Sequence, residues 1–144
     1  MSKVLLVDDE PDIHEILDVH LKRKGIDVEH ALTGEEGVEA YKKMLESNDL
    51  PDLVIMDLNL SGEKGIDGIE LHKEGKGKRI DGARAAEQIL KINPDAIIWG
   101  YTAWTDTEWA EKLRKAGAKK IVKRLVPFKE FAEMVADFLQ SANI

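Results

Sequence analysis

The chain has 144 residues, a formal net charge of −7 at pH 7 and no cysteine. This length suits one domain with a sizeable core, and the acidic balance excludes the basic surface that nucleic-acid binding requires. Without cysteine there are no disulfides and no thiolate metal sites. The apolar stretch after Met1 is too short for a signal peptide and no apolar run could span a membrane, so we expect a cytoplasmic protein without membrane contact.

Short apolar runs alternate with helix signals along the chain. The runs predict five strands, at residues 3–7, 26–31, 53–60, 96–101 and 120–124. The helix signals predict five helices, which open at Pro11, Thr33, Ile80, Thr105 and Pro127. Such alternation is typical of βαβ units with right-handed crossovers. We therefore expect a flavodoxin-like, doubly wound α/β fold, in which a five-stranded parallel sheet of order 2-1-3-4-5 lies between two layers of helices.

Local signals define some of these elements more closely. The strand at 26–31 is less apolar than the others, which places it near an edge of the sheet. The second helix opens with a capping box, in which Thr33 and Glu36 satisfy free backbone amides. The helical period predicts that this helix buries Val38, Tyr41 and Leu45.

The strand at 53–60 carries the most informative residue. It follows Pro51-Asp52 and is apolar on both faces, but Asp57 interrupts the run. An unpaired carboxylate is costly to bury, so Asp57 should lie where the strand emerges from the sheet. In open α/β sheets this carboxyl edge is where ligands bind.

Two further carboxylates should share that edge. Strands 1 and 3 are neighbours in the expected order, so Asp8 and Asp9 should face Asp57 across one crevice. Close carboxylates repel unless a cation joins them. Ligands that are all oxygen favour Mg²⁺, to which the Asn59 carbonyl can add one more oxygen. Alone, Asp8-Asp9 would be a helix cap and Asp57 a turn residue; their joint placement favours a metal site.

The last two strands add a hydroxyl and a cation to this edge. Thr102 ends the fourth strand, and its hydroxyl can donate to an anion. Lys123-Arg124 ends the fifth strand and can neutralise a phosphoryl group. Taken singly, a strand-end threonine and exposed basic residues are common features. Together with the carboxylates they are the parts needed for phosphoryl transfer onto a carboxylate.

These residues, in this order, resemble the receiver domain of two-component response regulators over essentially the whole chain. The matching residues are Asp8-Asp9, Asp57, Ile80-Asp81-Gly82, Thr102-Ala103 and Gly117-Ala118. The resemblance implies that residues 1–144 form a single receiver domain. It also implies a phosphoacceptor response regulator rather than an enzyme with turnover.

The resemblance further implies a role for each residue at the edge. A sensor histidine kinase would phosphorylate Asp57, giving an aspartyl phosphate. Asp9, Asp57 and the Asn59 carbonyl would bind Mg²⁺ directly, and Asp8 would bind it through water. Thr102 would contact the phosphoryl group and shift the face that the last two helices form with the last strand. A downstream protein target, or a second copy in a homodimer, would bind that face.

The chain departs from the family pattern in three places. Residues 61–79 look like an insertion between the third strand and the third helix, either a solvated loop or a lid over the site. The usual Lys-Pro after the last strand is altered, so the cation is either Arg124, at the lysine position, or Lys123 before it. Ile121 stands where the family has an aromatic residue.

Two alternatives stay open. A phosphohydrolase of the haloacid-dehalogenase type also has a nucleophilic Asp two residues before a polar one, as in Asp57-Leu58-Asn59, but there the motif lies on the first strand and ends in Asp. A pseudo-receiver would be a protein-binding scaffold that is never phosphorylated, which the altered Lys-Pro and Ile121 favour. The chain ends after the last helix, so we expect either a stand-alone regulator or one that lacks an output domain.

Overall fold

The structure is a computed structural model that describes residues 2–57, 82–102, 108–124 and 126–142. Its strands are β1 (Ser2–Val7), β2 (Ile26–Ala31), β3 (Leu53–Met56), β4 (Ile98–Thr102) and β5 (Lys120–Lys123). Its helices within the described ranges are α1 (Pro11–Arg23), α2 (Gly34–Glu46), α4 (Gly82–Ile92), α5 (Glu108–Ala116) and α6 (Phe128–Ala142). Asn59, the insertion at 61–79 and the expected helix starts at Ile80 and Thr105 lie outside the described residues.

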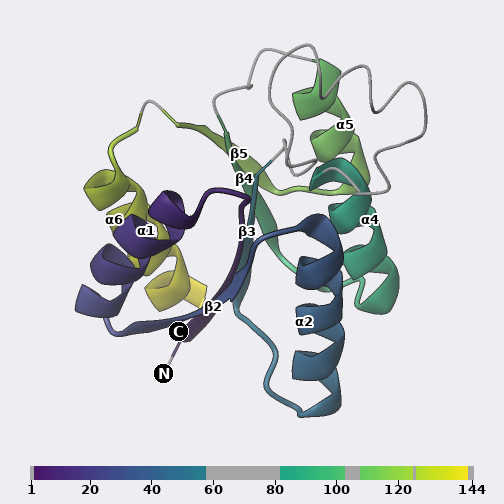
Figure 1. Ribbon diagram of the computed structural model, residues 1–144, viewed down its shortest axis with the longest axis horizontal. Helices are drawn as coiled ribbons and strands as arrows, with labels where there is room; N and C mark the ends of the chain where they lie inside the picture. Colours follow the sequence, from purple (N-terminus) through teal and green to yellow (C-terminus); the bar gives the residue numbers. More distant parts are fainter. Residues whose placement is uncertain (1, 58–81, 103–107, 125, 143–144) are drawn as a thin grey trace.

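The strands form one parallel sheet in the order β2-β1-β3-β4-β5, which confirms the predicted flavodoxin-like topology. Helices α1 and α6 pack together on one face of the sheet, and α2, α4 and α5 lie side by side on the other (Figure 1). Successive strand residues point to opposite faces, so Leu6 and Ile55 join the core under α1 and α6. Leu5 and Val54 join the second core under α2, α4 and α5.

Helix α2 follows the predicted capping box but not the whole predicted face. The hydroxyl of Thr33 accepts the Glu36 amide at 3.0 Å, and the Glu36 carboxylate accepts the Leu32 amide at 2.9 Å. Val38 and Tyr41 are buried as expected. Leu45 was expected to be buried and is 40% exposed, while its neighbour Met44 is buried. One residue turns a helix by about 100°, so Leu45 points in a different direction from the buried Met44.

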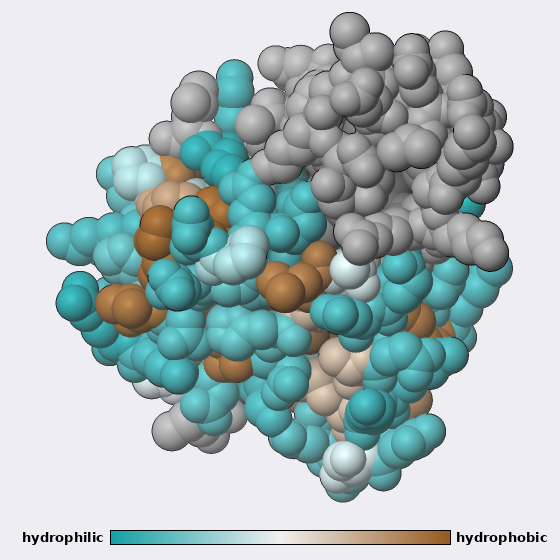
Figure 2. All heavy atoms as spheres, in the orientation of Figure 1, coloured by the Kyte–Doolittle hydropathy of each residue, from teal (hydrophilic) through white to brown (hydrophobic). Residues whose placement is uncertain are grey.

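One face of the described part of the protein is mainly polar (Figure 2). Figure 2 shows a face on which apolar residues form small, separate patches among hydrophilic ones. None of the helices within the described ranges combines the length and the apolar character needed to cross a lipid bilayer. Strand β2 is paired on one side only and has exposed residues, as expected for an edge.

The register of the sheet brings the ends of four strands, β1, β3, β4 and β5, to one edge. Val7 of β1 pairs with Met56 of β3, and the amide of Asp57 extends this ladder by donating to the Val7 carbonyl at 3.0 Å. In the same way, the amide of Arg124 donates to the carbonyl of Thr102, the last residue of β4, at 2.9 Å. The residues that follow these strands therefore emerge close together at the carboxyl edge.

Helix α2 packs closely on β1 at Gly37. A Cβ atom at Gly37 would lie 2.9 Å from Cγ2 of Val7, a branched side chain that is fully buried. We expect Gly37→Ala to lower the free energy of unfolding by about 1 kcal/mol, because overpacking outweighs the gain in helix propensity. Urea denaturation should show that Val7→Ala relieves this cost in the double variant, with a coupling energy of about 1 kcal/mol. Additive effects would contradict the packing argument.

Candidate functional site

Three carboxylates meet at the carboxyl edge of the sheet. Asp8 and Asp9 follow β1, Asp57 follows β3, and one oxygen from each lies within 4.8 Å of the others. Asp8 is 0% exposed and Asp57 is 6% exposed. The donor set consists of carboxylate oxygens, which suits a hard divalent cation. The cluster therefore fits a divalent metal site.

Backbone hydrogen bonds hold the first carboxylate in place. The amide of Asp8 donates to the Ala31 carbonyl of β2 at 3.1 Å, which continues the β1–β2 ladder by one residue. Its carboxylate Oδ1 accepts the Glu10 amide at 2.9 Å, which ties the side chain to the turn that leads into α1. The Asp8 carboxylate is thus fixed between the sheet and the first helix.

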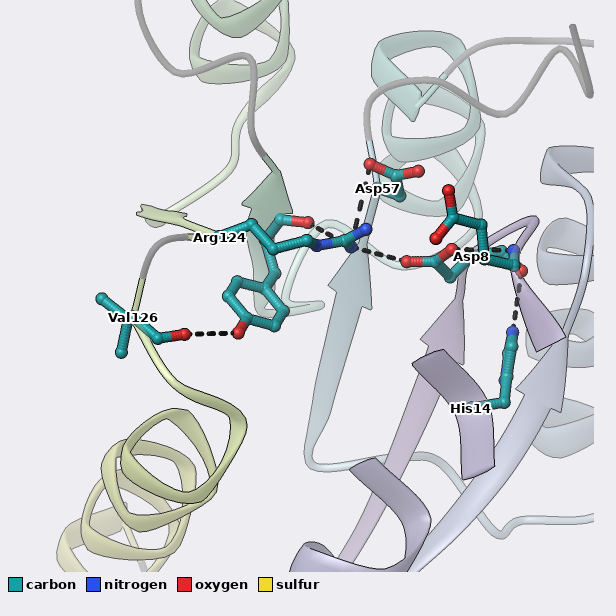
Figure 3. A network of polar contacts seen from close by, with 7 residues as sticks. Asp8, His14, Asp57, Arg124 and Val126 are labelled. Carbon is teal, nitrogen blue, oxygen red and sulfur yellow. Dashed lines mark hydrogen bonds and ion pairs between the residues drawn. The ribbon is translucent and has the colours of Figure 1, made fainter. Parts of the chain in front are cut away.

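A guanidinium group lies among these carboxylates. Nη2 of Arg124 donates to Oδ2 of Asp8 at 2.6 Å and lies 3.9 Å from Oδ1 of Asp57 (Figure 3). The Asp8 side chain is 1% exposed and the Arg124 side chain 18% exposed, so solvent screens this ion pair little. Arg124 therefore offsets part of the repulsion within the cluster.

Tyr101 fixes the position of that guanidinium. Its carbonyl accepts from Nη2 of Arg124 at 2.7 Å, and the guanidinium carbon lies 5.0 Å from the centre of its ring. The ring stacks on Phe131 of α6 at 3.9 Å, and its hydroxyl donates to the Val126 carbonyl at 2.7 Å. Burial raises the pKa of Tyr101 and the charge of Arg124 opposes this, leaving the pKa raised, so the hydroxyl stays a donor.

Of the two candidate cations, Arg124 is the one that lies beside Asp57. Lys123 is the last residue of β5, and its side chain is exposed. Thr102 is fully buried at the end of β4, where it pairs with Lys123. Met56 pairs with Gly100, so the same register carried forward places Thr102 one residue beyond the level of Asp57.

Comparison with known proteins identifies the family. A family model described as the response regulator receiver domain matches residues 4–78, just over half of the chain. The chain belongs to this family. Receiver domains are in general phosphoacceptors rather than turnover enzymes, and they take part in two-component signalling.

Relatives and solved structures agree with this assignment. Protein-glutamate methylesterase/protein-glutamine glutaminase 1 of Syntrophus aciditrophicus is 29% identical over 126 residues, which is 86% of this chain and 30% of the relative. The chain thus spans less than a third of the length of the curated relatives that it matches. A CheY-like receiver domain protein of Methanospirillum hungatei has the same fold, with a TM-score of 0.74 and 20% identity over 98% of this chain and 95% of that one. The CheX-CheY complex of Borrelia burgdorferi with BeF3 and Mg²⁺ also matches, with a TM-score of 0.74 and 19% identity over 96% of this chain and 89% of that one.

Two residues at this receiver site were not identified from the sequence. Tyr101 holds Arg124, but it precedes Thr102 in an apolar run and reads as core. His14 contacts the Asp8 carbonyl through Nε2 at 2.7 Å. A signal for His14 existed, because it follows Ile13 and lies three residues before Leu17, on the buried side of an amphipathic helix.

Removing Arg124 should destabilise the metal-free protein. We expect Arg124→Gln to lower the free energy of unfolding by about 3 kcal/mol in the presence of a chelator, because buried Asp8 loses its charged partner. The matched variant Lys123→Gln should change it by less than about 0.5 kcal/mol, since Lys123 is exposed. Urea denaturation of both variants measures this difference. Equal effects would show that the ion pair with Asp8 does not stabilise the fold.

Proposed function

We propose that this receiver domain is a phosphoacceptor response regulator, phosphorylated on Asp57 by a sensor histidine kinase in a Mg²⁺-dependent reaction. The observation that carries the proposal is the cluster of Asp8, Asp9 and Asp57 with a guanidinium 3.9 Å from Asp57. A nucleophilic carboxylate, ligands for a cation and a group for anionic oxygens are the requirements of phosphoryl transfer.

In the proposed reaction an oxygen of Asp57 attacks the phosphorus of a phosphohistidine. The O–P bond forms as the P–N bond breaks, and the bonding electrons return to the imidazole nitrogen of the kinase, which is then protonated. Asp57 suits this role because its backbone is fixed to β1 by the hydrogen bond to Val7. The rigid edge of the sheet thus presents the nucleophile in a defined position.

The carboxylates would hold the metal ion. Asp9, Asp57 and the carbonyl of Asn59, which lies outside the described residues, would bind Mg²⁺ directly, and Asp8 would bind it through water. Bound there, Mg²⁺ supplies positive charge that offsets the carboxylates and the oxygens of the transferred group. Support comes from the presence of Mg²⁺ and BeF3 in the CheX-CheY complex that shares this fold.

Thr102 and Arg124 would bind the phosphoryl oxygens after transfer. The Thr102 hydroxyl would donate one hydrogen bond, and Arg124 would turn from Asp8 to form charge-assisted hydrogen bonds. An arginine reaches further than the usual lysine and offers two parallel donors, which can serve both carboxylate and phosphoryl group. Lys123 stays a weaker candidate for this role, since its side chain is exposed.

The phosphoryl group adds a charge of about −2, which would be the switch. We propose that movement of Thr102 shifts the face formed by α5, β5 and α6, where a downstream protein target or a second copy binds. Ile121, at the usual aromatic position, is partly buried and packs against the core under α2, α4 and α5. At this position of β5 the coupling would therefore use the aliphatic packing of Ile121 in place of an aromatic ring. As for receiver domains in general, we place this process in the cytoplasm.

We also propose that residues 1–144 act as a single receiver domain, into which residues 61–79 are inserted next to Asp57. Because the insertion lies outside the described residues, its role as a lid or as a solvated loop stays a prediction.

A pseudo-receiver that is never phosphorylated is the competing function, and one observation favours it. Arg124 already pairs with Asp8, so a charge within the protein offsets part of the acidic cluster without any metal ion. In a scaffold of this kind the ion pair between Arg124 and Asp8 would serve only to stabilise the fold. Phosphorylation of Asp57 distinguishes the two functions.

Intact-mass spectrometry tests the phosphoacceptor directly. After incubation with Mg²⁺ and acetyl phosphate, or with a histidine kinase, the protein should gain one phosphoryl group. Asp57→Asn should abolish the gain because the nucleophile is lost. Asp52→Asn should leave it intact, because Asp52 precedes the same strand at its opposite end, where it accepts the Lys3 amide. Absence of any gain with both donors would support the scaffold.

Arg124→Gln should affect Mg²⁺ binding and phosphorylation in opposite directions. Loss of one positive charge beside the carboxylates should tighten Mg²⁺ binding about tenfold, as measured by titration calorimetry. Phosphorylation by acetyl phosphate should become slower, because the charge that stabilises the phosphoryl oxygens is missing. If both properties were unchanged, Arg124 would have no role in the reaction.

A further inference from the structure

Two histidines face each other beside the backbone of Asp8. His14 on α1 and His30 on β2 have their Nδ1 atoms 2.7 Å apart, with ring centres separated by 4.9 Å. His14 is 6% exposed, whereas the side chain of His30 is 37% exposed. The pair is thus anchored in the protein and open to solvent through His30.

The Nε2 atom of His14 must carry a hydrogen. Nε2 of His14 lies 2.7 Å from the carbonyl oxygen of Asp8, which can only accept (Figure 3). A neutral imidazole carries a single N–H, so in the neutral ring Nδ1 of His14 is left with a lone pair that points at His30.

The Nε2 atom of His30 also faces a hydrogen-bond acceptor. Nε2 of His30 lies 3.0 Å from Oδ1 of Asp18. Burial raises the pKa of Asp18, but hydrogen bonds from Lys22 and His30 lower it and prevail, so Asp18 is an ionised acceptor. Nε2 of His30 therefore donates, and in the neutral ring Nδ1 of His30 also presents a lone pair.

Two lone pairs at 2.7 Å repel, so between two neutral rings this contact requires a bridging cation, either a proton or a metal ion. Imidazoles that bind metal ions typically donate their outer N–H to a carboxylate or a backbone carbonyl, which orients the free nitrogen. Both histidines have this arrangement, one with Asp18 and one with the Asp8 carbonyl.

We propose that His14 and His30 form a second metal site, distinct from the acidic crevice, which binds a transition-metal ion such as Zn²⁺ through the two Nδ1 atoms. Imidazole nitrogen selects Zn²⁺, Cu²⁺ or Ni²⁺ over Mg²⁺, which prefers oxygen. With Zn–N bonds of about 2.0–2.1 Å, tetrahedral binding separates the nitrogens by roughly 3.4 Å, so the rings must open slightly. The exposed His30 can make this movement, and water completes the coordination.

Calorimetric titration with Zn²⁺ in millimolar Mg²⁺ tests the site. We expect a single Zn²⁺ to bind and His30→Gln to abolish that binding. His20→Gln should leave it intact, because His20 lies in the last turn of the same helix and outside the pair. Asp18→Asn should weaken it about tenfold, by removing the acceptor that orients His30.

Nuclear magnetic resonance of the side-chain nitrogens supplies a direct readout. Zn²⁺ should shift Nδ1 of His14 and His30 and leave both Nε2 atoms protonated. Absence of Zn²⁺ binding, or equal binding by His30→Gln with an unchanged circular dichroism spectrum, would overturn the proposal and leave a shared proton as the bridge. Asp57→Asn, which cannot accept a phosphoryl group, should still bind Zn²⁺ at the pair, so the site stands or falls separately from the proposed phosphoacceptor function.

Discussion

Three carboxylates lie close together at one end of the parallel sheet, and their mutual repulsion constrains the rest of the site. Because β1 and β3 are neighbours, the carboxylates of Asp8, Asp9 and Asp57 lie close together, with Asp8 and Asp57 buried. Like charges at this spacing must be offset by a cation or by bound protons. Arg124 supplies positive charge to these carboxylates, and His14 holds the backbone of Asp8.

Arg124 is the cation that the protein itself supplies. Its guanidinium reaches Asp8 because Tyr101 provides a carbonyl acceptor and an aromatic face, and Tyr101 is held in turn by Phe131 of α6. The crevice is thus joined through packed rings to the last helix, which belongs to the face proposed to bind partners. A change in the position of Arg124 would be felt at α6, and this gives a physical route from the carboxylates to the surface.

The end of β1 is braced from both faces of the sheet. On one face Gly37 allows α2 to approach Val7 so closely that a single added carbon would collide. On the other, His14 of α1 bonds the Asp8 carbonyl and contacts His30 of the edge strand. The first helix therefore connects the acidic crevice to the His14–His30 pair, although the two sites favour different classes of cation.

Much of this protein follows from local sequence patterns. Apolar runs alternating with helix signals predict the strands, their order and the buried faces, and the rule that parallel strands end at one edge brings Asp8, Asp9 and Asp57 together. Patterns of this kind did not show that Leu45 is exposed, that Arg124 rather than Lys123 lies beside Asp57, or that His14 meets His30. Each of these depends on the direction in which a side chain leaves its backbone. Arg124 and Asp8 are 116 residues apart in the chain, so their contact arises only when β5 and β1 are fixed in the same sheet.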